Sequence, residues 1–275
     1  MSLLPLPELF ALARPGGLAA FNVITLEHAE AIVSAAEITR RPVVLQISEN
    51  TVRYHGGLEP LAVACLRLAA RSPATLAVHL DHATSRELIS EAVEVGIDSV
   101  MFDGSALDYS ANVTATSEIV AWCHDRDVHV EAELGEIGGK DGAHAPGART
   151  DPDQAVEFVT ATGVDALAVA VGSSHAMHTR DARLDFDLIE ALTAKVGVPL
   201  VLHGSSGVPD AGLRGAVEAG MDKINLATRL NIALTEGIRA VLLVESKASD
   251  PRRYLGAGRN ALRDEGIRLI RILDV

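Results

Sequence analysis

Short apolar runs alternate with amphipathic stretches along the whole chain. Runs rich in aliphatic and β-branched residues predict eight strands, at residues 21–24, 42–48, 75–82, 99–104, 129–135, 166–172, 199–205 and 223–227. Apolar positions at helical spacing predict eight helices, at 27–40, 58–71, 85–96, 112–127, 151–163, 184–197, 208–220 and 229–245. Pro152 is typical of a helix start and Gly163 of a helix end.

Eight strand–helix units with nearly continuous apolar strands predict an α/β fold, the (β/α)8 TIM barrel. We expect a single domain over residues 1–275, with a C-terminal helical extension at about 250–275 that is basic and amphipathic. An open, doubly wound sheet is the alternative. The first strand is not followed by Gly-x-Gly-x-x-Gly, which argues against a dinucleotide-binding version of that sheet.

The charge balance narrows the class of partner. Lys plus Arg total 24 and Asp plus Glu total 37, a net charge of −13, so we expect neither nucleic acid nor an anionic membrane surface to bind. No apolar run approaches the roughly 20 residues of a membrane helix, and the first residues lack the basic start of a signal peptide.

Cys65 and Cys123 lack Cys-x-x-Cys spacing, which indicates reduced, buried thiols and a cytoplasmic protein.

Polar residues gather where the predicted strands end, which is where barrels of this kind place their chemistry. They are Asn22, Ser48, Asp81, His82, Asp103, Glu131, Glu133, His175, His203 and Asn225. So many ionisable groups around one barrel mouth would repel one another unless a cation binds there. Neutral imidazoles from His82, His175 and His203 would suit a catalytic Zn²⁺ with one open position. Asp103 and Glu133 would support these ligands or form an alternate metal position, whereas His79, two residues further back, is interpreted as packed or hydrogen-bonded.

Two Gly/Ser/Thr-containing turns predict an anion site. Residues 202–210, LHGSSGVPD, place Gly204 and Ser206 just before a helix start, and NLATR at 225–229 follows the last strand. Backbone N–H groups at such turns bind phosphate, and the loops after the seventh and eighth strands are the usual phosphate site of this fold.

These motifs together resemble the class II, zinc-dependent ketose-bisphosphate aldolases. The matching segments are FNVIT (21–25), QISEN (46–50), HLDH (79–82), SVMFDGS (99–105), VEAELGEIGG (130–139), DALAVAVGSSHAMH (165–178), LVLHGSSG (200–207) and KINLAT (223–228). The chain is compact and carries Ala227 where the fructose-bisphosphate type usually has Asp. It therefore looks more like the tagatose-bisphosphate type.

The resemblance implies a lyase that reversibly cleaves a fructose- or tagatose-type ketose 1,6-bisphosphate into dihydroxyacetone phosphate and glyceraldehyde 3-phosphate. Because no strand is expected to offer a Schiff-base lysine, Zn²⁺ would act as the electron sink. Asp81 would exchange a proton with the C4 hydroxyl. The substrate site would be lined by Asn22, Ser48, Ala176, Gly204, Ser206, Asn225 and Thr228. The family also implies a monovalent cation, Na⁺ or K⁺, and a homodimer or homotetramer with C-terminal helices at its interface.

The chain departs from the family pattern in one stretch that bears on catalysis. The Gly-rich segment 138–147 reads as a mobile loop, and the family's Gly-Gly-x-Glu-Asp motif is here Gly-Gly-Lys-Asp-Gly, one residue shorter and without Glu. We expect Asp141 to be the proton-abstracting base; Glu136, a water, or a merely solvating Asp141 are the alternatives. Ala176 replaces a usual Gly, and His178 stands where the family often has Tyr, so it is not read as a ligand.

Two other functions stay open at this point. One is a related metal-dependent aldolase acting on another phosphorylated keto-sugar or sugar acid, of the inositol-catabolism type. The other is a non-catalytic sugar-phosphate-binding barrel, against which the presence of Asp81 argues.

Overall fold

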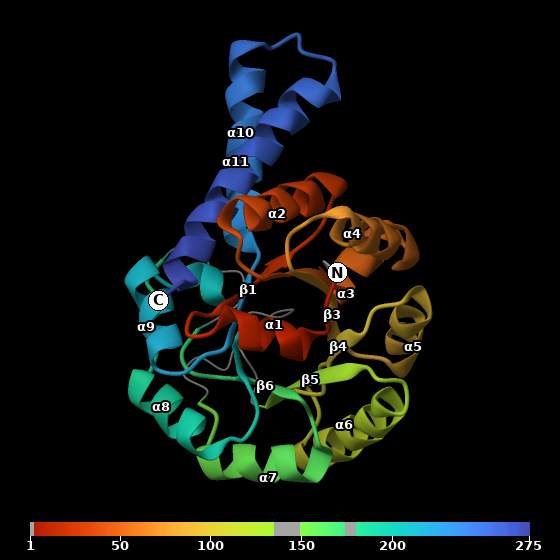
Figure 1. Ribbon diagram of the computed structural model, residues 1–275, viewed down its shortest axis with the longest axis vertical. Coiled ribbons are helices and arrows are strands. Elements are labelled where there is room, and N and C mark those ends of the chain that lie inside the picture. Colours follow the sequence, from red (N-terminus) through yellow and green to blue (C-terminus); the bar gives the residue numbers. More distant parts are fainter. Residues whose placement is uncertain (1–2, 135–148, 174–179) are drawn as a thin grey trace.

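Eight parallel strands close into a barrel in the computed structural model, which describes residues 3–134, 149–173 and 180–275 (Figure 1). Each strand pairs with the next, and the last pairs with the first. The strands are β1 (Leu18–Asn22), β2 (Val43–Ser48), β3 (Leu76–Ala83), β4 (Ser99–Phe102), β5 (His129–Leu134), β6 (Ala166–Val169), β7 (Leu200–Leu202) and β8 (Lys223–Leu226). The predicted (β/α)8 TIM barrel is therefore confirmed.

Helices surround the barrel and bury the outward faces of its strands. They are α2 (Leu26–Thr39), α4 (Glu59–Arg71), α5 (Arg86–Val95), α6 (Tyr109–His124), α7 (Pro152–Thr162), α8 (Phe186–Lys195) and α9 (Asp210–Glu218). The larger hydrophobic core lies between this ring and the strands. The predicted helix ends match to within a few residues, because Gly96 and Gly163 end α5 and α7 in the left-handed conformation that glycine adopts without cost.

A smaller core fills the amino-terminal half of the barrel interior. Helix α1 (Leu6–Ala13) lies across that end, with Leu6, Leu9 and Phe10 buried against inward-facing strand residues (Figure 1). Those strand residues are small or aliphatic, such as Val44 and Ala77. Because side chains alternate along a strand, the next inward positions toward the carboxyl ends are the polar ones described below.

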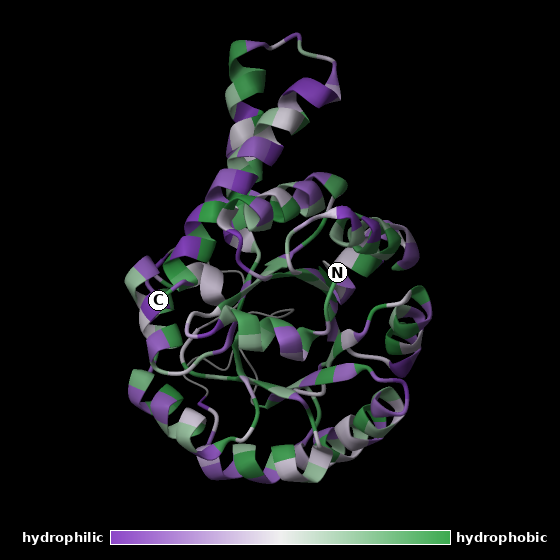
Figure 2. Cartoon of the chain, in the orientation of Figure 1, coloured by the Kyte–Doolittle hydropathy of each residue, from purple (hydrophilic) through white to green (hydrophobic). Residues whose placement is uncertain are grey.

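The C-terminal region forms two long helices, α10 (Thr228–Val244) and α11 (Pro251–Leu273). They pack against each other and project from the barrel, and α11 then returns along α2 and α9 (Figure 1). Their backbones approach closely where they cross: a Cβ added to Gly258 would lie 2.8 Å from the carbonyl oxygen of Leu234. Apolar Leu243 and Val244, at the end of α10, are 83% and 85% exposed. Hydrophobic (green) and hydrophilic (purple) segments alternate along the projecting helices (Figure 2).

Some elements differ from the sequence-based expectations, and β6, β7 and α6 depart from their predicted bounds by about three residues. Strand β1 begins three residues earlier than predicted, because Leu18-Ala19-Ala20 contains no β-branched residue to mark it. Helix α1 and helix α3 (Glu49–His55) were not predicted; both are shorter than the window of about 11 residues over which helical periodicity can be recognised. Within the described ranges, no helix is both long and apolar enough to span a bilayer.

Candidate active site

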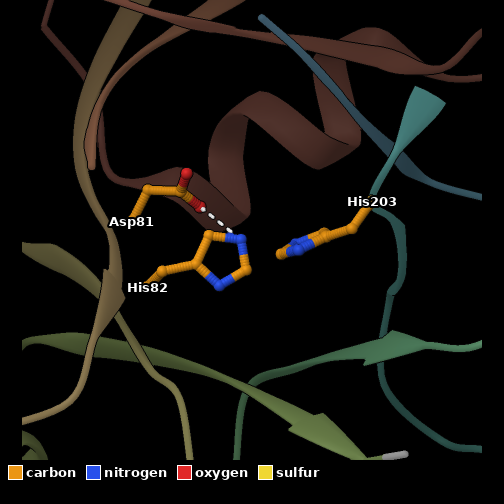
Figure 3. A group of neighbouring side chains, drawn as sticks. All are labelled: Asp81, His82 and His203. Carbon is orange, nitrogen blue, oxygen red and sulfur yellow. Dashed lines mark ion pairs between the residues drawn. The ribbon is translucent and has the colours of Figure 1, made fainter. Parts of the chain in front are cut away.

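Strand β3 brings two neighbouring residues, Asp81 and His82, to the same mouth of the barrel (Figure 3). In a regular strand they would point to opposite faces. Here His82 adopts a left-handed φ of 54°, and the pairing of β3 with β4 shifts register between Leu80 and Ala83. This local irregularity turns the imidazole inward, beside the carboxylate.

The imidazole of His82 meets that of His203, which directly follows β7 (Figure 3). The two rings lie edge to face, with centroids 4.6 Å apart. Asp103, after β4, has Oδ2 at 2.8 Å from His82 Nδ1. The buried carboxylate of Glu133, on β5, lies near both rings, with Oε2 3.9 Å from His82 Nδ1 and 3.6 Å from His203 Nδ1.

These groups form two overlapping sets whose potential ligand atoms all lie within 4.8 Å of one another. The first set is Asp81, His82 and His203, and the second is His82, Asp103 and Glu133. Imidazole nitrogens and carboxylate oxygens are the donors that Zn²⁺ and related ions accept. The arrangement therefore fits a divalent metal, and it brings together four of the five residues that the sequence analysis assigned to metal binding. The fifth, His175, lies outside the described residues.

Asp81 is almost fully buried and is held by two amides. Asn22, at the end of β1, donates from Nδ2 to Asp81 Oδ2 at 3.0 Å, and Asn225, on β8, donates to Oδ1 at 3.4 Å. Gln46 on β2 orients Asn22 in turn, because its Nε2 donates a hydrogen bond to Asn22 Oδ1 at 3.3 Å. The carboxylate is thus oriented from three strands.

The charge state of Asp81 follows from its surroundings. Burial is the largest single influence on its pKa and would raise it, but the nearby His82, His203 and Lys223 together outweigh burial and hold the pKa well below its usual range. Asp81 is therefore ionised at neutral pH, as a group that accepts a proton from a hydroxyl must be.

A second, deeper layer of charge lies beneath the mouth, and the sequence analysis missed its significance. Lys223, the first residue of β8, is fully buried, with Nζ 2.7 Å from Glu131 Oε2. Glu131 Oε1 lies 3.0 Å from His203 Nε2. Strand alternation was the available signal, since Glu131 and Glu133, like Lys223 and Asn225, are two residues apart and share the inward face. A lysine does therefore lie inside the barrel, contrary to expectation, but it forms an ion pair.

His79 is buried in this deeper layer and is hydrogen-bonded rather than placed at the mouth, as predicted. Its Nδ1 lies 2.7 Å from Ser99 Oγ. Burial is the main cause that lowers the pKa of His79, to about 3, so the ring is neutral.

The predicted anion site lies at the carboxyl ends of β7 and β8. Gly204 has a φ of 65° and precedes a 3₁₀ turn, η1 (Ser205–Gly207). Ser206 Oγ accepts a hydrogen bond from the backbone N–H of Ala227 at 3.4 Å, so the two loops are in contact. Thr228 is the first residue of α10, and the N–H groups of that first helical turn carry the partial positive charge that binds anions.

Of the remaining predicted site positions, Ser48 lies in the described part of the chain and the others do not. Ser48 ends β2 and pairs in register with Asp81, but its Oγ also caps α3 by accepting from the N–H of Thr51. Asp141 and Ala176, like Glu136 and His178, lie outside the described residues, so their proposed roles stay predictions. Cys65 and Cys123 are free and buried, as expected for reduced thiols.

Comparison with known proteins assigns the chain to one enzyme family. The family model for class II fructose-bisphosphate aldolase matches residues 7–275. The chain is 31% identical to the YdjI aldolase from Escherichia coli K12, with a TM-score of 0.87 and coverage of 98% of this chain and 97% of that one. It is 29% identical to a putative fructose-1,6-bisphosphate aldolase from Coccidioides immitis, again at a TM-score of 0.87, with coverage of 98% and 96%.

The fold also matches the fructose-bisphosphate aldolase of Campylobacter jejuni, at 19% identity, a TM-score of 0.83 and coverage of 99% of this chain and 95% of that one. At this identity the likeness concerns the fold alone. The family match, by contrast, covers nearly the whole chain, including both loops of the anion site and the strand ends that carry Asp81, His82 and His203. The chain belongs to the class II fructose-bisphosphate aldolase family, and it is an aldolase, a lyase.

Proposed function

We propose that this protein is a Zn²⁺-dependent aldolase that reversibly cleaves a fructose- or tagatose-type ketose 1,6-bisphosphate into dihydroxyacetone phosphate and glyceraldehyde 3-phosphate. The observation that supports it best is the convergence of His82, His203 and Asp81 at one barrel mouth, beside the loops of the anion site. The family is generally metal-dependent and acts on phosphorylated sugars.

The metal would be held by His82 and His203, with His175 as the third ligand and Asp103 and Glu133 close enough to support or share it. When bound, Zn²⁺ supplies a Lewis acid that polarises the ketose carbonyl and stabilises the negative charge left by cleavage. Asp103 lies behind His82 Nδ1 and fixes the direction of that ring.

Asp81 is the group that we assign to the C4 hydroxyl. In cleavage it takes the hydroxyl proton while the C3–C4 bond breaks, so that C4 becomes the aldehyde carbon and the electron pair stays on the three-carbon fragment. In condensation it returns the proton. Asn22 and Asn225 keep the carboxylate pointed at this proton. Protonation at C3 needs a second group, for which Asp141 is the candidate, with Glu136 or a water as alternatives.

The phosphate groups would bind at the rim of the mouth. Gly204, Ser206 and Thr228 would present backbone N–H groups and hydroxyls there, with Ser48 and Asn22 nearer the sugar chain. Ala176, outside the described residues, stays a proposed contact of the substrate. Asn225 would contact the enediolate; the support is that its amide lies between Asp81 and His203. A monovalent cation, Na⁺ or K⁺, beside the phosphate would offset the net charge of −13.

We also propose that the protein forms a homodimer or homotetramer. The support is the projecting pair α10 and α11, which ends in exposed Leu243 and Val244. Apolar side chains on such a projection are more stable when another subunit covers them.

The function is tested by measuring cleavage of a panel of phosphorylated ketoses and keto-sugar acids, with and without EDTA. We expect turnover of fructose or tagatose bisphosphate that EDTA abolishes and Zn²⁺ restores. Turnover of another substrate alone would support the related aldolase, and binding without turnover the non-catalytic barrel. Turnover that resists EDTA and is trapped by borohydride would refute the metal mechanism and point instead to Lys223.

A further inference from the structure

The buried ion pair between Lys223 and Glu131 has no role in the reaction as described so far. Both side chains are fully buried, one layer below the mouth, with Nζ and Oε2 2.7 Å apart. Desolvating two charges costs several kcal/mol per ion, and a well-packed apolar pair of the same volume is often as stable or more so. Stability alone is therefore a poor reason for a lysine and a glutamate at this depth.

The second oxygen of Glu131 suggests another reason. Oε1 lies 3.0 Å from His203 Nε2, so the three residues form one chain from ammonium to carboxylate to imidazole. The negative carboxylate favours a hydrogen on Nε2, because two lone pairs at this distance would repel. That tautomer leaves the lone pair of the ring on Nδ1.

Asn225 Nδ2 also lies close to the His203 ring, 3.0 Å from Nε2. It is a donor, and its orientation is fixed by Asp81, which can only accept from it. Asn225 by itself would favour a lone pair on Nε2, but the bond from Nε2–H to the charged Glu131 carboxylate is the stronger of the two, and Asn225 keeps its bond to Asp81. His203 Nδ1 points toward Glu133, at 3.6 Å, on the side where His82 and Asp103 also gather.

We propose that Lys223 and Glu131 are positioning residues for His203: Lys223 holds the Glu131 carboxylate in place, and Glu131 fixes the His203 ring in the tautomer whose Nδ1 is the metal ligand. This inference depends on the proposed metal site. It gives His203 the same kind of support that Asp103 gives His82, in which a carboxylate behind one ring nitrogen prepares the other for the metal.

The test replaces the pair by apolar residues and measures metal binding directly. The double variant Glu131→Met/Lys223→Met removes both charges together, so it leaves no unpaired ion in the core. Affinity for Co²⁺ is measured by competition with a chelator, the visible absorption of Co²⁺ reports its coordination, and thermal unfolding reports the fold. We expect an unfolding midpoint close to that of the wild type, Co²⁺ affinity lowered by about 10- to 100-fold, and an altered Co²⁺ spectrum.

A second variant covers the case in which the double variant does not fold. Glu131→Asp keeps the charge beside Lys223 but withdraws the carboxylate by one methylene from His203, so Co²⁺ affinity should again fall. The matched control is Ser99→Ala, which removes a buried hydrogen bond to His79 in the same layer and should leave Co²⁺ affinity unchanged.

The outcomes separate this inference from the proposed function. If the wild type binds neither Co²⁺ nor Zn²⁺, the metal site itself is wrong. If the wild type binds but the folded Glu131→Met/Lys223→Met protein, or the folded Glu131→Asp protein, binds Co²⁺ as tightly and with the same spectrum, the positioning role is refuted and the aldolase proposal stands.

Discussion

Replacing Asp81 by Asn tests the proton transfer without changing the size of the side chain. The carboxylate accepts from both Asn22 and Asn225, at 3.0 and 3.4 Å. An asparagine at this position has one acceptor oxygen, so one of the two donors loses its partner. At 3.4 Å the bond from Asn225 is the weaker, and we expect it to be the one lost, at a cost of about 1–3 kcal/mol in unfolding free energy.

The kinetic effect should be larger than the effect on stability. A positioned general acid/base contributes about 10²- to 10⁴-fold to a rate, which corresponds to about 3–5 kcal/mol of activation free energy. Because the substrate phosphates would bind, under the proposed function, at the loops after β7 and β8 and away from Asp81, Asp81→Asn should lower kcat for cleavage by this factor and leave KM nearly unchanged.

A second measurement on the same variant isolates the step. Asp81 is assigned to the C4 hydroxyl only, so exchange of the C3 proton of dihydroxyacetone phosphate with deuterated water, followed by NMR, should persist. Cleavage that falls less than about threefold, or exchange lost to the same extent as cleavage in a folded, metal-loaded variant, would refute the assignment.

Three further predictions concern stability and assembly. Burial lowers the pKa of His79 from 6.5 to about 3. As the pH falls between these two values, the unfolded chain binds a proton that the folded protein does not, so the unfolding free energy decreases, by at most about 1.4 kcal/mol per pH unit. His79→Gln should make the unfolding free energy, measured by denaturant titration, depend less on pH in this range. Gly258→Val would place side-chain atoms against the α10 backbone, and should lower the thermal midpoint and raise protease sensitivity in α10 and α11. Leu243→Glu combined with Val244→Glu should shift sedimentation toward the monomer while the far-ultraviolet circular dichroism stays unchanged.

The sequence was sufficient for the barrel because its periodic signals are strong. Eight apolar runs alternating with helices leave few topologies, and the polar residues at the strand ends predicted which end carries the site. That the strand ends carrying His82 and His203 share one mouth could be expected on the same grounds, since the carboxyl ends of all eight parallel strands lie around it.

What the sequence did not reveal depends on three-dimensional contact. Glu131 was placed on the right strand without a role, because nothing in its local pattern indicates that it meets Lys223, 92 positions away. The left-handed turn at His82 was also invisible, since histidine rarely adopts it and no glycine marks it. The alternation of side chains along a strand predicts which face of the sheet such a residue occupies, but it does not predict which residue of another strand it contacts.

The irregular end of β3 has a mechanical consequence. Because Asp81 and His82 share a single peptide unit, the proton acceptor and a ligand of the proposed metal site are linked by covalent geometry rather than by packing between separate strands. Fluctuations of the barrel move both backbone positions together, so the distance between these two positions depends little on motions of the surrounding loops. Specificity can then diverge through the other seven strand ends while this coupled pair keeps its alignment.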